Sequence, residues 1–409
     1  MHRSPACRFA AVLQRCTLLW LCVFCAGLTA RAAAAASDTV QCLFEDNRIY
    51  VPVQVHGSSP RWFILDTGAA PTVVDAQLAR ELKLETHGDE VVSGVGSGQS
   101  HQQHTRDLSL AIGSTPLHIG DAAVADLAGL LGPSSGRAPA GVIGSQFFLE
   151  HVVEFDFDAA RMTVHAPDTD LSTRYDASVP LHFNSAIPMA DMRLQLASGK
   201  TLRPRVVVDL GAKSTLLLPE PFIARTHLRE ALPHIVVSGF GAGMGGDTRY
   251  AFARAQQLAF HAAPALALSQ PLLGLSVDGT LRSRWHDGLL GAQFLSRFRI
   301  AFDYRRSRLL LTQLSTRPPE FDRSGMYLMA SGADLRRVLV REVHAESPAA
   351  RAGLQPGDEI ESIDDAAVST LGLPAVRATL RSDAAASVTL GIARNGRRWN
   401  VDLALENVL

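Results

Sequence analysis

Two short segments of this 409-residue chain each place an aspartate after an apolar run and shortly before a glycine. Residues 63–75 read FILDTGAAPTVVD, and residues 206–218 read VVVDLGAKSTLLL. A carboxylate in this position lies at a tight turn that leaves a strand, because glycine allows the backbone to approach closely. Two related turns could bring Asp66 and Asp209 together. Two adjacent carboxyl groups cannot both ionise easily, so they share a proton.

A carboxyl pair of this kind can hold a water molecule between its two groups. The ionised group acts as a base toward the water, and the protonated group acts as an acid toward a leaving amine. Such a pair can hydrolyse a peptide bond without a metal ion or a covalent intermediate. We therefore take Asp66 and Asp209 as the candidate catalytic residues.

The two aspartates belong to an internal repeat. VVSGVGSGQ starts at Val91 and returns as VVSGFGAGMGG at Val236, while GVIGSQFF at Gly141 returns as GLLGAQFL at Gly288. These landmarks keep the same order, and their offsets drift only from 143 to 147 residues. Duplication of a domain of roughly 140 residues explains this pattern, because solenoid repeats have periods of only about 20 to 50 residues.

The elements that must position the two aspartates are mostly predicted strands. Residues 49–55, 61–66 and 152–157 alternate or are continuously apolar, contain β-branched residues and are bounded by turn residues. One short helix is predicted after each Asp-x-Gly motif, at about residues 75–84 and 219–229. The pattern therefore predicts a mainly β fold.

The repeat resembles the pepsin–retropepsin family of aspartic proteases over roughly residues 40–315. The first copy has Leu-Asp-Thr-Gly-Ala from Leu65 and Val-Ile-Gly from Val142, and the second has Val-Asp-Leu-Gly-Ala from Val208 and Leu-Leu-Gly from Leu289. One Asp-Thr-Gly alone is a weak signal, but its pairing with the apolar-apolar-Gly element in both copies is specific. The resemblance implies two acid-protease β-barrel lobes in a pseudo-dimer, each with one catalytic aspartate.

The resemblance also implies roles for residues around the two aspartates. Three residues would support the catalytic turns, and four glycines would belong to flap hairpins that close over the substrate. It implies no metal ion and no cofactor. The turn residues are Thr67, Gly68 and Gly211, and the flap residues are Gly94, Gly96, Gly239 and Gly241.

The second copy departs from the family pattern directly after its aspartate. The family usually has Thr or Ser there, and the two hydroxyl groups hydrogen-bond across the interface between the lobes, whereas this chain has Leu210. The pair could be asymmetric and active, or Asp209 could be only structural in a non-catalytic peptide-binding protein. A homodimer could also pair Asp66 with Asp66 of a second chain. We favour the first interpretation, because Asp209 and Gly211 are retained and an idle buried carboxylate is costly.

The C-terminal part of the chain resembles a PDZ domain of the bacterial type attached to exported proteases. Ser-Pro-Ala-Ala from Ser347, Ala-Gly-Leu from Ala352 and Pro-Gly-Asp from Pro356 mark an α+β domain over about residues 322–405. PDZ domains bind an extended peptide, often at its free C-terminus, by strand addition. The alternative is a PDZ domain that only packs on the protease as a cover or a dimer contact. The loop that would hold the peptide carboxylate is Gly325, Met326, Tyr327 and Leu328.

Residues 1–36 have the pattern of a secretory signal peptide. Basic residues precede an apolar core, and an Ala-rich stretch suited to cleavage follows. We therefore expect export across the inner membrane to the periplasm, with an uncleaved anchor as the alternative. Composition changes then predict lobes at residues 37–177 and 178–316 and a PDZ domain at residues 317–409.

Charge and hydropathy limit the partners of the exported chain. The formal net charge of all 409 residues is −1, which gives no electrostatic case for nucleic-acid binding. No segment after the signal peptide is apolar enough to span a membrane. We therefore predict an exported aspartic endopeptidase that acts on peptides or proteins, with a PDZ domain that binds substrate or partner peptides.

Overall fold

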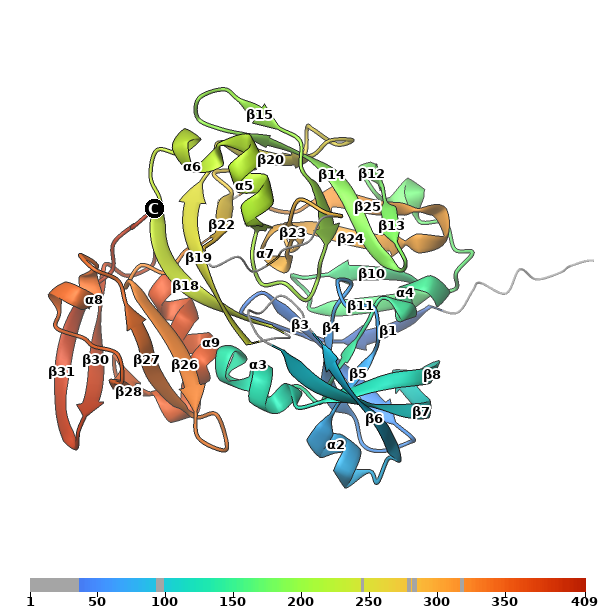
Figure 1. Ribbon diagram of the computed structural model, residues 1–409, viewed down its shortest axis with the longest axis horizontal. Helices are drawn as coiled ribbons and strands as arrows, with labels where there is room; N and C mark the ends of the chain where they lie inside the picture. The colour runs from blue at the N-terminus through green and yellow to red at the C-terminus, as the bar shows by residue number, and fades with distance from the viewer. Residues whose placement is uncertain (1–36, 93–98, 244–245, 278–280, 282–284, 317–319) are drawn as a thin grey trace, which may run out of the picture. The chain divides into compact units, whose positions relative to one another are not determined.

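The computed structural model describes residues 37–92, 99–243, 246–277, 281, 285–316 and 320–409 (Figure 1). Within these residues the strands are arranged in four sheets, which confirms the mainly β fold predicted from the apolar patterns. No helix in this described part is long and apolar enough to cross a membrane. The predicted signal peptide and the predicted flap glycines Gly94 and Gly96 lie outside the described residues.

The first copy of the repeat folds into a sheet of eight strands. In spatial order these are β2 (Leu43–Glu45), β3 (Arg48–Val55), β4 (Arg61–Leu65), β9 (Gly141–Ile143), β5 (Val73–Asp75), β8 (Thr115–Ala125), β7 (Ser100–Ile112) and β6 (Thr86–Val92). Strand β3 also pairs with β7, with Val53 opposite Ile112, so the sheet closes toward a barrel. Alternate residues of β3, namely Val51, Val53 and Val55, are fully buried because one face of the strand faces the core.

The second copy folds into a larger sheet. Its main path runs β18 (Val236–Gly243), β19 (Gly246–Arg254), β22 (Leu272–Ser276), β17 (Leu216–Leu218), β23 (Leu289–Leu290), β16 (Arg205–Val208), β14 (Ile187–Gln195), β20 (Gln257–Phe260) and β21 (Leu268–Ser269). Strands β13 (His182–Asn184) and β15 (Thr201–Leu202) pair with β14 beside this path.

The two sheets have the same strand order. The path β3-β4-β9-β5-β8-β7-β6 corresponds strand by strand to β14-β16-β23-β17-β22-β19-β18. Corresponding neighbours also agree in direction: β4–β9 and β16–β23 are parallel, while β5–β9 and β17–β23 are antiparallel. The topology therefore supports the domain duplication that the repeated motifs indicate.

A six-stranded sheet joins the two copies. Its central strands β10 (Val152–Asp156) and β24 (Phe298–Asp303) are equivalent in the repeat and pair antiparallel, with Val153 opposite Phe302. Backbone hydrogen bonds therefore hold the two lobes together in one unit. The outer strands are β11 (Arg161–His165) and β1 (Asp38–Gln41) beside β10, and β25 (Arg308–Gln313) and β12 (Ala177–Pro180) beside β24.

Short helices connect these strands. Helix α2 (Ala76–Glu81) begins after Asp75, whose carboxylate accepts a hydrogen bond from the Gln77 N–H. Helices α5 (Glu220–Thr226) and α6 (Leu228–Ala231) are separated by His227, which has a left-handed φ of 53°. These helices lie where the two helices were predicted. The others in this part are α3 (Leu127–Ser135), α4 (Gln146–Glu150), α7 (Ala292–Leu295) and the 3₁₀ helices η1 (Ser172–Arg174) and η2 (Tyr304–Arg306).

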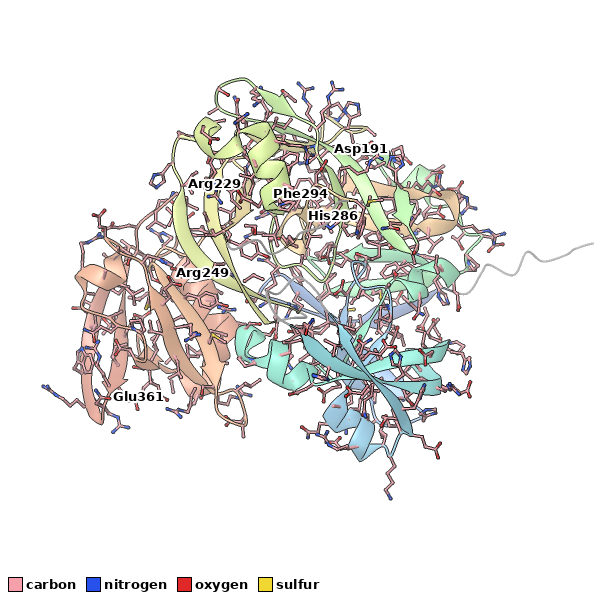
Figure 2. The ribbon with its side chains drawn as sticks, viewed as in Figure 1. Asp191, Arg229, Arg249, His286, Phe294 and Glu361 are labelled. Carbon is pink, nitrogen blue, oxygen red and sulfur yellow. The ribbon has the colours of Figure 1, made fainter. Side chains whose placement is uncertain are left out.

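Aromatic side chains fill a core that both lobes share. Phe294 of α7, labelled in Figure 2, is fully buried, and its ring centroid lies 5.5 Å from that of Phe260. Phe148 of the first lobe stacks on Tyr304 of the second at 5.5 Å and meets Phe302 edge-on at 5.3 Å. The core therefore continues across the boundary between the two copies.

The C-terminal part has its own sheet and its own core. The sheet runs β26 (Met326–Ser331), β27 (Arg337–Val343), β28 (Glu359–Ile363), β30 (Ser387–Arg394) and β31 (Arg397–Ala404), with β29 (Ala366–Ala367) beside β28. Helices α8 (Pro348–Arg351) and α9 (Val368–Arg381) accompany it, and Leu373, Val376 and Leu380 of α9 are buried in its core. This arrangement fits the predicted α+β domain, and β26 is the edge strand of its sheet. The domain boundaries at residues 177 and 316 stay predictions.

Candidate active site

Each candidate aspartate follows a strand that pairs with the apolar-apolar-Gly segment of its own copy. The Asp66 N–H, directly after β4, donates to the Ile143 carbonyl oxygen at 3.0 Å. The Asp209 N–H, directly after β16, donates to the Leu290 carbonyl oxygen at 2.9 Å. The segments around Gly144 and Gly291 therefore hold the start of each turn.

The two turns have the same internal hydrogen bonds. In each, one carboxyl oxygen of the aspartate accepts from the N–H groups of the second and third residues after it. These bonds fix the side-chain orientation and stabilise the ionised form. They run from Gly68 (2.8 Å) and Ala69 (3.0 Å) to Asp66 Oδ1, and from Gly211 (2.8 Å) and Ala212 (3.1 Å) to Asp209 Oδ1.

The fold brings the two carboxyl groups into contact. The carboxyl groups of Asp66 and Asp209 lie close enough to share a hydrogen bond, and each also lies against the turn glycine of the opposite lobe. Both turn glycines are required for this approach: a Cβ on Gly68 would lie 2.7 Å from Cγ of Asp209, and a Cβ on Gly211 would lie 2.3 Å from Cγ of Asp66. No larger residue fits at either position without moving a carboxyl group.

The environment of the pair raises both pKa values. Burial, and then the charge of Asp66, raise the pKa of Asp209 well above its ordinary value of 3.8. Burial also raises the pKa of Asp66, but the hydrogen bond with Asp209 and the charge of Arg48 oppose this shift. The pair therefore retains one proton over a range of pH in which two isolated aspartates would both be ionised.

Thr67 connects the two turns without a hydroxyl partner in the second lobe. Its Oγ1 donates to the Val208 carbonyl oxygen at 2.7 Å and accepts from the Leu210 N–H at 3.0 Å. The hydroxyl of Thr67 thus bonds to backbone groups of the opposite turn. These groups are present although residue 210 is a leucine. The Leu210 side chain is fully buried and packs against apolar neighbours. The interface is asymmetric, but the two aspartates still meet.

We expect Thr67→Val to lower the free energy of unfolding by about 1–3 kcal/mol, because two buried backbone groups, the Leu210 N–H and the Val208 C=O, lose a partner. Urea unfolding of the variant and the wild type measures the loss. Thr67→Ser is the matched control, since it keeps the hydroxyl. A loss in Thr67→Ser as large as that in Thr67→Val would contradict this reasoning, because serine keeps the hydroxyl that bonds to both backbone groups.

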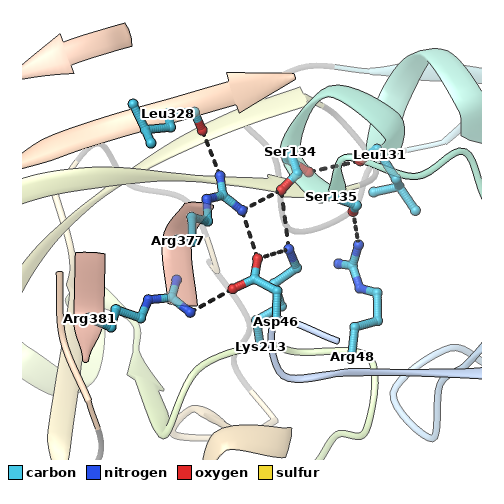
Figure 3. A network of polar contacts seen from close by, with 9 residues as sticks. All are labelled: Asp46, Arg48, Leu131, Ser134, Ser135, Lys213, Leu328, Arg377 and Arg381. Atoms are coloured by element: carbon cyan, nitrogen blue, oxygen red, sulfur yellow. Dashed lines mark hydrogen bonds and ion pairs between the residues drawn. The ribbon is translucent and has the colours of Figure 1, made fainter. Parts of the chain in front are cut away.

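A buried ionic cluster lines the cavity that contains the two aspartates, and the sequence pattern did not indicate it (Figure 3). The carboxylate of Asp46 is 3% exposed and pairs with Lys213 at 2.8 Å, Arg377 at 2.7 Å and Arg381 at 2.6 Å. Although burial alone would raise it, these three cations hold the pKa of Asp46 well below 3.8. Burial lowers the pKa of Lys213 to about 7. The cluster joins the first lobe, the second lobe and helix α9.

Arg48 and Tyr304 are two further residues near the pair that motif reading missed. Arg48 is buried on β3, donates to the Ser135 hydroxyl and has an Nε without a hydrogen-bond partner among the described residues. Tyr304 is also buried, and burial together with the charges of Asp66 and Asp209 raises the pKa of its hydroxyl. Arg48 lies outside the repeated motifs, and Tyr304 stands in the repeat where the first copy has Phe157, so the repetition alone assigns neither residue to the site.

A cavity of about 480 Å³ opens at the aspartate pair. Its apolar walls come from both lobes and from the C-terminal domain. Such a mixture of apolar walls and a few polar groups is typical of sites that bind peptides or small molecules. Residues that represent the three walls are Ile64 and Val142, Leu217 and Leu289, and Phe321 and Leu328.

The other predicted site residues are only partly described. Gly239 and Gly241 lie in the β18–β19 hairpin, in which Gly243 is opposite Gly246. Strands β6 and β7 form the equivalent hairpin of the first lobe, with Val92 opposite Ser100, but the described residues do not include Gly94 and Gly96.

The predicted carboxylate-binding loop precedes and begins β26. Met326, Tyr327 and Leu328 line the cavity that contains the aspartates. The N–H groups of Gly325 and Met326, which were predicted to hold a peptide carboxylate, instead donate to Oδ1 of Asp322 at 2.8 and 3.3 Å. Among the described residues, no group of His, Cys, Asp and Glu side chains is suited to a metal ion.

Comparisons with known proteins agree with this geometry. A family model described as aspartyl protease matches residues 51–147, and one described as PDZ domain matches residues 339–394. The chain combines an aspartyl-protease-like domain with a PDZ domain. The aspartyl-protease match covers Asp66 and the Gly144 segment, and Asp209 lies outside it.

No curated protein matches this chain. Among solved structures, the aspartic proteinase from Irpex lacteus is similar at 16% sequence identity. That similarity covers 69% of this chain and 98% of the proteinase, with a TM-score of 0.45.

Proposed function

We propose that this protein is an exported aspartic endopeptidase that hydrolyses peptide bonds with a water activated between Asp66 and Asp209. The observation that carries the proposal is the contact of the two carboxyl groups at the end of matched turns, inside a cavity of about 480 Å³. An asymmetric residue at position 210 does not disturb this contact, since Thr67 bonds to the backbone there.

The single proton of the pair defines a role for each carboxyl group. The ionised group takes a proton from the attacking water, while the protonated group gives its proton to the oxygen of the scissile carbonyl. Collapse of the tetrahedral intermediate then moves a proton to the leaving amine, and the pair again holds one proton. The N–H groups of Gly68 and Gly211 keep the two side chains oriented throughout.

The geometry favours a pair within one chain over a homodimer. Asp66 already contacts Asp209, so an Asp66–Asp66 pair would require the two lobes of each chain to separate. That separation would break the β10–β24 pairing and the shared aromatic core. The location in the periplasm is part of the proposal and is supported only by the pattern of residues 1–36.

Cleavage of a mixed peptide library by the chain from Ser37 onward tests this function, beside Asp66→Asn. We expect wild-type cleavage to be greatest at acidic pH and to fall as pH rises through the raised pKa of Asp209, because the pair then loses its shared proton. A pepstatin-type peptide, whose hydroxyl mimics the tetrahedral intermediate, is expected to inhibit cleavage.

The same experiment separates the proposal from its rival. If the wild type cleaves no peptide at any pH and does not bind the hydroxyl-containing peptide, the chain is a non-catalytic peptide-binding protein. Cleavage that persists in Asp66→Asn would also contradict the proposal, since it would come from another site or a contaminant.

A further inference from the structure

Groups of the same chain occupy the peptide-binding face of the PDZ domain. Strand β26 is the edge strand of its sheet, and strand addition by a peptide would use this edge. Helix α3 of the first lobe packs against β26, and Figure 1 shows α3 beside this strand. The edge that a peptide would extend is therefore covered by the protease.

Glycine residues at the end of α3 allow this close packing. A Cβ on Gly132 would lie 3.0 Å from Cδ1 of Leu335, in the turn between β26 and β27. A Cβ on Gly136 would lie 2.9 Å from both Cβ of Leu373 and Cδ of Pro374, in α9. At these two positions the helix therefore presents backbone, and no side chain, to the β26–β27 turn and to α9.

Arg377 of α9 connects the edge strand to the protease (Figure 3). Its Nη2 donates to the Leu328 carbonyl oxygen of β26 at 2.6 Å. Its Nη1 donates to the Ser134 carbonyl oxygen of α3 at 2.8 Å and pairs with Asp46 at 2.7 Å. A backbone acceptor of the edge strand and one end of α3 are thus held by the same guanidinium group.

The carboxylate position of the PDZ domain is also occupied. Oδ1 of Asp322 accepts hydrogen bonds from the N–H groups of Ser324 at 3.0 Å, Gly325 at 2.8 Å and Met326 at 3.3 Å. These amides precede and begin β26, where a PDZ domain would bind the terminal carboxylate of a peptide. Asp322 supplies a carboxylate from within the chain.

We propose that the PDZ domain is a lid that docks on α3 through its own peptide-binding face and limits access to the aspartate pair. Its residues Met326, Tyr327 and Leu328 form part of the cavity that contains Asp66 and Asp209. A peptide that adds to β26 must first separate this strand from α3. Peptide binding by the PDZ domain and opening of the cavity are therefore coupled. The statement on access rests on the proposed function, whereas the statement on docking does not.

Gly132→Leu tests the docking, because the added side chain meets Leu335 of the PDZ domain while leucine is a better helix former than glycine. Gly120→Leu is the matched control: Gly120 is exposed on β8 and a Cβ there has no neighbour within 4 Å. Hydrogen exchange of the β26 amides is measured in the chain from Ser37 onward. We expect exchange about tenfold faster in Gly132→Leu than in the wild type or Gly120→Leu, because overpacking opens the contact.

A second substitution shows whether the effect arises at this contact. Leu335→Gly in the Gly132→Leu background removes the side chain that the new leucine meets, and glycine tolerates the φ of 57° at position 335. Exchange is expected to return toward the wild-type rate. If exchange remains fast in the double variant, Gly132→Leu has disturbed α3 itself. That result would overturn the docking proposal.

Cleavage of a fluorogenic library peptide by the same variants tests the lid. An increase of kcat/KM in Gly132→Leu alongside faster exchange supports it. Unchanged exchange overturns the docking, and faster exchange with reduced cleavage overturns the lid, because the PDZ domain would then be a needed wall of the substrate site. If no variant cleaves, the proposed function fails, and exchange alone decides whether the docking exists.

Discussion

Asp209→Asn is expected to reduce kcat/KM for peptide cleavage by about 10³- to 10⁴-fold, although the family match does not include this residue. The substitution keeps the size of the side chain but removes the group that shares a proton with Asp66. General acid–base catalysis contributes roughly 10²- to 10⁴-fold, and the amide can serve neither as acid nor as base. Initial rates at acidic pH, with the protein confirmed as folded, measure the loss.

Asp191→Asn is the matched control in the same lobe. Asp191, labelled in Figure 2, pairs with Arg205 at 2.7 Å on the surface, where it is 41% exposed. Exposed pairs contribute little to stability, so this variant is expected to cleave like the wild type. Full activity in Asp209→Asn with none in Asp66→Asn would instead indicate a homodimer that uses two copies of Asp66. Equal loss in both would confirm the pair within one chain.

Asp209→Asn also changes how stability depends on pH. The folded-state pKa of Asp209 lies well above its ordinary 3.8, so the unfolded chain releases this proton at lower pH than the folded one. The contribution of Asp209 is present in full below pH 3.8 and is lost as pH rises through the folded-state pKa. The wild type is therefore expected to lose stability with rising pH over this window, and the asparagine variant is expected to lose less.

The sequence predicts the aspartate pair because each part of it is local. The Asp-x-Gly turns and the apolar-Gly segments are short motifs, and their repetition predicts two lobes that meet. How Leu210 is accommodated was not predictable from its residue type, since the Thr67 hydroxyl bonds to the Val208 carbonyl oxygen and to the N–H of position 210, which every residue except proline supplies. A leucine at position 210 indicated that the hydrogen bonds between two hydroxyl groups across the interface are lost. In the structure Thr67 still hydrogen-bonds across the interface, to backbone groups.

The ionic cluster around Asp46 could not be predicted from short sequence motifs. Asp46 is 167 residues from Lys213 and 331 residues from Arg377 along the chain, so no short segment of sequence contains the interaction.

The PDZ loop shows a different limit of prediction from sequence. That this loop holds a peptide carboxylate stays a prediction, and in the structure the Gly325 N–H donates to Asp322, three residues earlier. The motif did not indicate that Asp322 bonds to the amides of Gly325 and Met326.

Asp46→Asn is expected to destabilise the folded chain by about 3–5 kcal/mol, because breaking a buried ion pair leaves its partners without a counter-charge. Three cations, Lys213, Arg377 and Arg381, pair with this one carboxylate. The backbone is not the cause, since asparagine tolerates the left-handed φ of 47° at this position. Denaturant unfolding and hydrogen exchange of α9 measure the loss of stability and of docking.

Glu45→Gln is the adjacent control. Glu45 pairs with Arg137 at 3.0 Å, with both side chains about one-third exposed, so its loss is expected to cost about 1 kcal/mol or less. If the two variants lose equal stability, the Asp46 cluster is not an effective tie between the PDZ domain and the lobes, and the lid must be held by the α3 contact alone.

The loss caused by Asp46→Asn is expected to depend on pH through Lys213. Burial already lowers the pKa of Lys213 to about 7, and removal of the Asp46 charge lowers it further. At about pH 8 the Lys213 side chain is largely neutral in the folded variant, so it adds little unpaired positive charge to the buried cluster. At about pH 5 the unfolded chain holds the lysine proton, while the folded variant must either release it or bury an unpaired charge. The destabilisation relative to wild type is therefore larger at pH 5, and an equal loss at both pH values would show that the two arginines alone carry the effect.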